Sequence, residues 1–144
     1  MSQENVKIVK AFYAAFGRGG FDAAADFWDP SMDYRAIEGA VDDAGVLYGL
    51  EALGRYIAGW IQTFDELRVE PEELIDAGDQ VVVVVRLTGR MKASDAAVDM
   101  RLGVVYTFRD GKIVRGREYA TRAEALKAVG LEEQAPGVSE CRAG

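Results

Sequence analysis

Apolar residues recur at helical spacing in two stretches of the chain. In the first stretch they follow the i, i+3, i+4, i+7 pattern, at Val9, Phe12, Tyr13 and Phe16. This pattern predicts a helix over 4–16 that ends at Gly17. The second stretch predicts a helix over 51–64. One face of that helix is apolar and strongly aromatic, with Leu53, Tyr56, Ile57, Trp60, Ile61 and Phe64.

The segment between these helices is less regular. Residues 22–28 predict a short helix, which Pro30 prevents from continuing. A short strand is predicted over 32–37. A loop over 38–49 follows, with three glycines and an Asp42-Asp43 pair, and long loops in small domains are often functional. Two adjacent carboxylates alone are a weak metal signal.

The second half of the chain has the pattern of strands. Strands are predicted over 67–77, 80–93, 98–108 and 113–120. Asp110-Gly111 is typical of a type I′ hairpin turn. Thr121 and Glu124 form a capping box, so a short helix begins there and ends at Gly130. The order predicts an α+β fold, with helices packed on one face of an antiparallel sheet.

The predicted strands are long enough to require bending. Twelve residues in a strand would span roughly 40 Å. Each of the last three strands has an interior glycine, Gly89, Gly103 or Gly116, and such glycines mark bulges or bends. A curved sheet with helices across its concave side encloses a cone-shaped space, and side chains decide whether that space is a solid core or a pocket.

Strand alternation assigns inward and outward faces. The inward positions of the strand over 80–93 are Val81, Val83, Val85 and Leu87. Those of the strand over 98–108 are Met100, Leu102, Val104, Tyr106 and Phe108. In the last strand the outward positions are Ile113, Arg115, Arg117 and Tyr119. The inward ones are then Val114, Gly116, Glu118 and Ala120.

Glu118 is therefore a carboxylate on the side facing the helices. Burial would raise its pKa, which suits a general acid or base near neutral pH. The small neighbours Gly116 and Ala120 would leave room beside it. The alternative is structural: an arginine neutralises Glu118, or it lies in water near the strand end.

Composition narrows the classes of function. The chain has 144 residues, a net charge of -7, no histidine and one cysteine, Cys141. The acidic balance argues against nucleic acid and anionic membranes. The missing histidine excludes histidine bases and imidazole metal sites, and a single cysteine excludes an internal disulfide. No leader or membrane-spanning segment is visible, so a cytoplasmic protein is expected.

Several motifs together carry a family resemblance. The chain contains "FDAAADFWDP", "GLEALGRYIAGWIQTF", "FRDGKIV" and "RAEALKAVGL". From about Asn5 to Leu131 it resembles the SnoaL-like branch of the nuclear-transport-factor-2-like superfamily. The resemblance implies a single domain over 1–131. The residues from Glu132 on are polar and include Pro136 and Gly137, which predicts a disordered tail over 132–144. The resemblance also implies a cone-shaped α+β barrel in which a curved, mixed sheet wraps around the N-terminal helices, with a deep apolar pocket and usually a homodimer through the sheet.

The superfamily includes ketosteroid isomerases, limonene-epoxide hydrolases, polyketide cyclases and non-catalytic binding proteins. Tyr13 matches the helix tyrosine that ketosteroid isomerases use as an oxyanion donor, but Ala36 and Val104 stand where their two acids would fall. Glu118 matches an acid in the last strand of limonene-epoxide hydrolases, whereas Arg86 supplies at most the arginine of their Arg-x-Asp partner.

The resemblance implies catalytic roles for Glu118 and Tyr13, with no metal or cofactor. The alternative for Tyr13 is a structural role, as a core aromatic residue whose hydroxyl has a hydrogen-bond partner. A small apolar ligand would contact pocket walls formed by Phe12, Phe16, Trp28, Tyr56, Trp60, Met100, Leu102, Val104 and Tyr106. These residues also suit ordinary core packing.

The outer sheet face is expected to be basic. Its arginines are Arg86, Arg90, Arg101, Arg115 and Arg117. One interpretation is a solvated face with Asp99 among the arginines. The other is a dimer interface, in which a second subunit covers an apolar centre of Val82, Val84 and Val105 and the arginines form its rim.

Three functions stay open at this point. The first is a cofactor-free acid/base enzyme (an isomerase, cyclase, dehydratase or epoxide hydrolase) acting on a small apolar ligand. The second is a non-catalytic binding module with a vestigial pocket. The third is an interaction protein that uses its sheet face.

Overall fold

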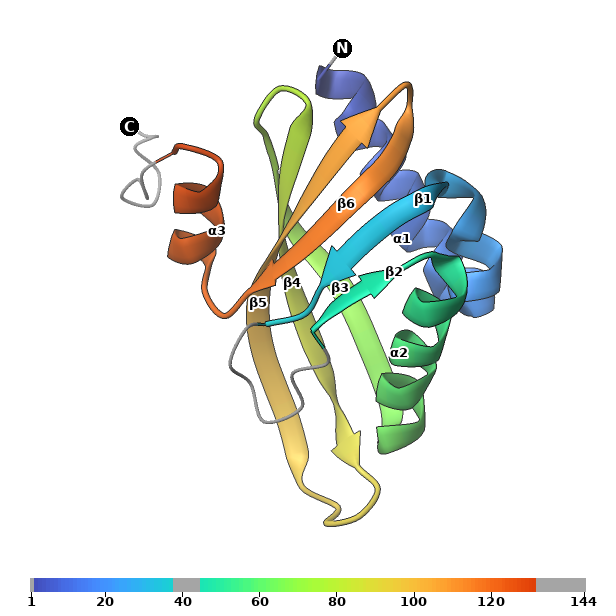
Figure 1. Cartoon of the computed structure of the whole chain (residues 1–144). Helices are drawn as coiled ribbons and strands as arrows, with labels where there is room; N and C mark the ends of the chain where they lie inside the picture. Colours follow the sequence, from blue (N-terminus) through green and yellow to red (C-terminus); the bar gives the residue numbers. More distant parts are fainter. Residues whose placement is uncertain (1, 38–44, 132–144) are drawn as a thin grey trace.

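Helix α1 (Ser2–Ala24) opens the chain in the computed structural model, which describes residues 2–37 and 45–131 (Figure 1). The helix is longer than predicted, because it continues through Gly17 and changes direction at Gly19 and Gly20. Gly20 has a φ of 72°, which is accessible to glycine at no steric cost. A short 3-10 turn, η1 (Ala25–Phe27), follows. Residues 22–27 of the predicted helix over 22–28 are therefore divided between the end of α1 and this turn, and Trp28 begins the first strand.

Helix α2 (Leu50–Thr63) confirms the predicted helix over 51–64 within one residue at each end. The strands are β1 (Trp28–Arg35), β2 (Val46–Tyr48), β3 (Phe64–Asp76), β4 (Gln80–Met91), β5 (Ala97–Arg109) and β6 (Lys112–Tyr119). They form one sheet in the order β2-β1-β6-β5-β4-β3. The β1–β6 pair is parallel and the other pairs are antiparallel, so the sheet is mixed. The predicted α+β class is confirmed.

Strand β2 lies in the segment predicted as a loop. It has three residues and pairs only with β1, at the edge of the sheet. Strand β1 also begins earlier than predicted, and Pro30 falls where its pairing with β6 shifts register, as expected for a proline inside a strand. Asp42, Asp43, the tail over 132–144 and Cys141 lie outside the described residues.

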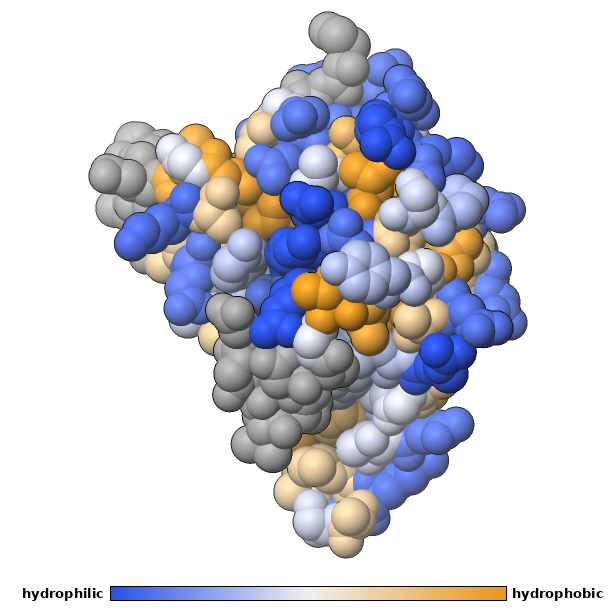
Figure 2. All heavy atoms as spheres, in the orientation of Figure 1, coloured by the Kyte–Doolittle hydropathy of each residue, from blue (hydrophilic) through white to orange (hydrophobic). Residues whose placement is uncertain are grey.

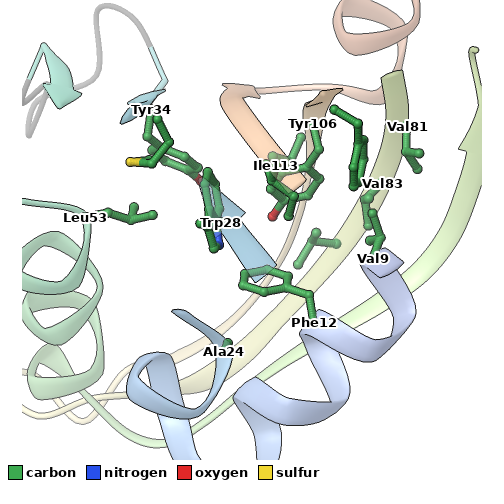
Figure 3. Packing of buried hydrophobic residues seen from close by; sticks show 14 of the residues in the cluster. Val9, Phe12, Ala24, Trp28, Tyr34, Leu53, Val81, Val83, Tyr106 and Ile113 are labelled. Carbon is green, nitrogen blue, oxygen red and sulfur yellow. The ribbon is translucent and has the colours of Figure 1, made fainter. Parts of the chain in front are cut away.

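The two faces of the sheet carry different helices (Figure 1). Helices α1 and α2 cover the inner face, where the main hydrophobic cluster includes Val81, Val83, Val85 and Phe12. Helix α3 (Arg122–Ala128) packs on the outer face. Figure 3 shows Phe12 of α1 directed toward the rings of Trp28 and Tyr106, with ring centroids 5.8 and 5.9 Å away.

Helix α3 covers part of the outer apolar centre within the same chain. Val82 and Val105 are 0% and 3% exposed and pack against Ala125 and Leu126. Gly103 permits this approach, since a Cβ there would lie 2.6 Å from the Ala125 Cβ. The predicted capping is confirmed, because the Thr121 hydroxyl accepts the Glu124 N–H at 3.1 Å.

The predicted face of Ile113 is wrong. Alternation placed it outward with Arg115, but Ile113 is fully buried in the inner cluster. The cause is a register shift, since Thr107 pairs with Arg115 and the next residue, Phe108, pairs with Ile113. The shift is typical of a β-bulge at Val114, which changes the parity of the strand.

The outer arginines are paired with acids from neighbouring strands. Arg86 makes a two-bond pair with Asp99 at 2.8 and 3.0 Å. Asp33 accepts from Arg117 at 2.7 Å and from Arg115 at 3.2 Å. Figure 2 shows a band of hydrophilic side chains through the middle of this view, with hydrophobic side chains on both sides of it. The charges of these arginines are therefore paired within one chain.

No helix among residues 2–37 and 45–131 has both the length and the apolar character needed to cross a membrane.

Candidate functional site

A cavity of about 120 Å³ lies between the inner sheet face, α1 and α2. Its lining is mostly apolar or aromatic: Phe12, Tyr13, Phe16, Tyr34, Tyr56, Ile57, Trp60, Ile61, Leu67, Val69, Val85, Leu87, Leu102, Val104, Tyr106 and Glu118. Sites for drug-sized ligands are usually about 300–1,000 Å³. In this conformation, the cavity therefore accepts a molecule of only a few non-hydrogen atoms.

Glu118 is the one charged side chain among the described residues that line this cavity. It is partly buried on β6, and two tyrosines from other elements donate to its two carboxyl oxygens. The Tyr34 hydroxyl, from β1, makes a short hydrogen bond to Oε2. The Tyr56 hydroxyl, from α2, lies 3.3 Å from Oε1. These contacts fix the orientation of the carboxyl group toward the inner space.

A second polar pair faces the same cavity. The hydroxyl oxygens of Tyr13, from α1, and Tyr106, from β5, lie 2.7 Å apart. Either hydroxyl can be the donor in this bond, so the pair uses one of its two protons internally. The other proton is available to a ligand oxygen, since no further acceptor for it is seen in the part of the chain that the structure describes.

Burial raises the pKa of Tyr13, Tyr34 and Tyr106, and the negative charge of Glu118 raises each of these pKa values further. A buried phenol resists ionisation because the phenolate loses its hydration. All three hydroxyls therefore stay protonated at neutral pH. They can act as hydrogen-bond donors toward the carboxylate or toward a bound ligand.

The structure brings most of the predicted site residues together. Glu118 and Tyr13 line the cavity, as do the predicted wall residues Phe12, Phe16, Tyr56, Trp60, Leu102, Val104 and Tyr106. Trp28 and Met100 are not among its described lining residues; both pack in or against the inner cluster. Tyr34 was absent from the predicted site. The alternation of Met32, Tyr34 and Ala36 with Asp33 and Arg35 is a signal that would have placed it inward.

Gly116 lets Tyr34 reach Glu118. A Cβ at this position would lie 2.5 and 2.7 Å from two carbons of the Tyr34 ring and 3.3 Å from the Trp28 ring. Those rings fill the space above the glycine backbone. The missing side chain at position 116 thus sets where the Tyr34 hydroxyl lies.

We expect Gly116→Ala to destabilise the protein by about 1–3 kcal/mol, because overpacking displaces buried rings. Urea unfolding measures this change. Gly59→Ala in α2 is the control, since nothing lies within 4 Å of a Cβ at position 59. A helical Gly→Ala change stabilises by roughly 0.5–1 kcal/mol. Equal unfolding free energies for the two variants would contradict the role assigned to Gly116.

Within the described ranges, no group of three or more acidic or cysteine side chains could hold a metal ion. The polar side-chain groups of the described lining residues are one carboxyl group, four tyrosine hydroxyls and the indole N–H of Trp60. Such a set can transfer a proton and hydrogen-bond an oxygen.

A family model described as a SnoaL-like domain matches residues 9–116. No curated protein matches the sequence. Among solved structures, a candidate SnoaL-like polyketide cyclase from Jannaschia sp. CCS1 is 22% identical, with a TM-score of 0.72 over 92% of this chain and 95% of that one.

Two similar structures contain small molecules. TerC, co-crystallised with polyporic acid, is 20% identical, with a TM-score of 0.71 over 88% of this chain and 98% of its own. A protein with a ketosteroid isomerase-like fold from Catenulispora acidiphila, in complex with trimethylamine, is 20% identical, with a TM-score of 0.66 over 90% and 97% of the two chains. At these identities the likeness shows a shared fold.

Proposed function

The chain belongs to the SnoaL-like domain family, and from that premise we propose that it binds a small, mostly apolar carbonyl compound and moves a proton on it without a cofactor. One observation carries the proposal. A carboxyl group held by two tyrosines, Glu118, and a tyrosine pair with a spare proton, Tyr13 and Tyr106, line the same apolar cavity.

The groups suit the two halves of an enolisation. The Glu118 carboxylate takes a proton from the carbon beside the carbonyl. The electron pair of that C–H bond forms a carbon–carbon double bond, and the carbonyl oxygen gains the negative charge. The hydroxyl pair of Tyr13 and Tyr106 donates to this oxygen. Return of the proton from Glu118 to another carbon completes an isomerisation. In D2O, Glu118 first exchanges its proton with the solvent, and transfer of the deuteron to the carbon completes an exchange.

The walls of the cavity are mostly apolar. Phe12, Val85 and Val104 are 4%, 3% and 3% exposed, and together with other apolar lining residues they leave few polar groups for a ligand to contact. Ile61 is 42% exposed and also lines the cavity, which places its opening beside α2. The cavity volume limits the substrate to a compact molecule unless the side chains of α2 move.

The relatives support small-molecule binding as the general role. TerC was crystallised with polyporic acid, and the Catenulispora protein with trimethylamine. These ligands differ in size and charge, so they support small-molecule binding in general. The proposed substrate class therefore rests on the side chains of this cavity.

Hydrogen–deuterium exchange of a small cyclic ketone tests the proposal. Cyclopentanone is incubated with the protein in D2O, and the loss of its α-proton signals is followed by NMR. We expect the protein to accelerate this loss over buffer, and Asp99→Asn, on the outer face, to behave like the native protein. No acceleration of exchange would contradict the proposed enzyme.

A non-catalytic binding module is the second candidate. The small volume of the cavity and the internal hydrogen bonds of Glu118 favour it, because a satisfied carboxylate can serve structure alone. The same experiment separates the two functions. A thermal shift with cyclopentanone in the absence of exchange would support binding without catalysis.

We also propose that the protein forms a homodimer through the outer sheet face. The family resemblance supports this proposal. The apolar residues of the face, Val82, Val84 and Val105, are already buried within one chain, so a partner would contact the arginine–carboxylate pairs around them, such as Arg86–Asp99. Sedimentation at micromolar concentration is expected to give a dimer. A clean monomer would refute this proposal.

A further inference from the structure

Tyr34 and Glu118 lie on neighbouring strands, and the register of these strands brings their side chains together. Strands β1 and β6 are parallel, with Tyr34 opposite Gly116. Glu118 follows Gly116 by two residues, so its side chain points to the same face of the sheet. Two residues along a strand span roughly 7 Å. The Tyr34 side chain crosses this distance over the glycine, where a Cβ would lie 2.5 Å from its ring.

The packing around the Tyr34 ring leaves its hydroxyl little freedom. Tyr34 is 7% exposed, and the ring centroids of Trp28 and Tyr56 each lie 6.0 Å from its own. Its hydroxyl donates to Oε2 of Glu118. The Tyr56 hydroxyl lies 3.3 Å from Oε1, beyond the roughly 2.5–3.0 Å that is usual between two oxygens in a hydrogen bond. Tyr34 is therefore the better placed of the two donors.

A hydrogen bond from a phenol favours the ionised form of a carboxyl group. Burial in an apolar cavity has the opposite effect, because a carboxylate loses its hydration. The balance matters for the proposed function, since only ionised Glu118 can take a proton from carbon. The pKa of Tyr34 is raised most by burial and next by the negative charge of Glu118, and the hydrogen bond to Glu118 also raises it. The favoured state of the pair is thus a neutral phenol that donates to a carboxylate.

Other titratable groups surround Glu118. On the inner side, its charge acts on Tyr13 and Tyr106, which bond to each other at 2.7 Å. Glu118 also borders a cleft at the ends of β1 and β6, beside α3. The ionisable side chains that share this cleft are Arg35, Arg117, Tyr119, Glu124 and Lys127. These groups carry charges of both signs, and their effect on Glu118 is common to the native protein and to a Tyr34→Phe variant.

We propose that Tyr34 is a positioning residue that holds Glu118 ionised and directed into the cavity at neutral pH. The inference deepens the proposed function and rests on its assignment of Glu118 as the base. Tyr34 acts through Glu118 and transfers no proton to the substrate. Without its hydroxyl, the carboxyl group protonates at a higher pH, so the pH range in which the base is active becomes narrower.

Carbon-13 NMR of protein labelled at the glutamate carboxyl carbons follows the titration of Glu118 directly. Its signal is identified as the one that Glu118→Gln lacks. We expect the titration midpoint of Glu118 to lie at least about one pH unit higher in Tyr34→Phe than in the native protein, because the carboxylate loses a hydrogen bond. An unchanged midpoint in Tyr34→Phe would overturn the inference.

Tyr106→Phe is the matched control, because it removes a buried hydroxyl from the same cavity and keeps Tyr34 in place. The midpoint is expected to rise by less than half as much as in Tyr34→Phe. Equal rises would show a general response of the buried site and overturn the inference. If Tyr34→Phe does not fold by circular dichroism, Gly116→Ala serves instead, since its Cβ displaces the Tyr34 ring. The midpoint is again expected to rise, and an unchanged midpoint would overturn the inference.

Exchange of cyclopentanone at several pH values keeps the two proposals apart. When both hold, the loss of rate on the acid side moves to higher pH in Tyr34→Phe by the same shift as the NMR midpoint. Exchange by the native protein with an unchanged midpoint in Tyr34→Phe would leave the proposed function standing and reject the inference. A raised midpoint without any exchange by the native protein would reject the enzyme and keep the role of Tyr34 toward Glu118.

Discussion

Glu118→Gln is expected to slow protein-catalysed deuterium exchange of cyclopentanone by roughly 10²–10⁴-fold, the usual contribution of a positioned acid or base. The glutamine amide cannot accept a proton from carbon, but its oxygen can still accept the hydrogen bond that Tyr34 now donates to Glu118. The change therefore removes the chemistry and leaves the geometry of the cavity in place. NMR integration of the α-protons over time gives the two rates.

The control for this variant is a carboxylate of the outer face. Asp99 is exposed and paired with Arg86, and Asp99→Asn is expected to exchange the ketone at the native rate. A Glu118→Gln protein that is folded and retains the native rate would remove Glu118 from the mechanism.

Phe12→Ala is expected to lower the free energy of unfolding by about 3–5 kcal/mol. Phe12 is 4% exposed, and its ring makes edge-on contacts with Tyr13, Trp28 and Tyr106. Figure 3 shows its ring extending from α1 toward Trp28 and Tyr106. The truncation leaves a space that the surrounding rings fill only in part. Because the free energy of unfolding of small domains is about 5–15 kcal/mol, this loss is a large share of the total stability.

Urea unfolding measures the Phe12→Ala effect, with Tyr48→Ala as the comparison. Tyr48 is an aromatic residue on β2 that is 73% exposed, and its removal is expected to change stability by less than about 0.5 kcal/mol. A loss below about 1 kcal/mol for Phe12→Ala would show that this ring is not a central part of the core.

The face of Glu118 could be predicted because alternation works well near its strand end. Arg117 beside it is strongly hydrophilic and pairs with Asp33 on the outer face, so the next residue points inward. The helix of aromatic residues was equally clear, since six apolar positions in 51–64 repeat at helical spacing. Its Tyr56, predicted as a wall residue, also donates to Glu118.

The face of Ile113 could not be predicted, because it depends on a bulge. Val114 carries no local sign of the register shift that turns Ile113 inward. When one extra residue is inserted in a strand, the residues beyond it point to the opposite face of the sheet. Alternation counted from the strand end is therefore correct for Glu118 and wrong for Ile113.

The partners of Glu118 depend on which strands meet. Tyr34 reaches it because β1 pairs with β6 in parallel, with Tyr34 opposite Gly116. The hydrophobic pattern of a short strand does not predict which other strand it pairs with. Strand β2 was missed for a related reason, since three residues at a sheet edge are too few to show alternation.

A crystal structure of the protein soaked with cyclopentanone tests the central claim most directly. The account predicts the ketone in the inner cavity, with its oxygen accepting a hydrogen bond from Tyr13 or Tyr106 and a neighbouring carbon against the Glu118 carboxylate. Ketone bound elsewhere beside an empty cavity, or Glu118 turned away from the ligand into solvent, would contradict it.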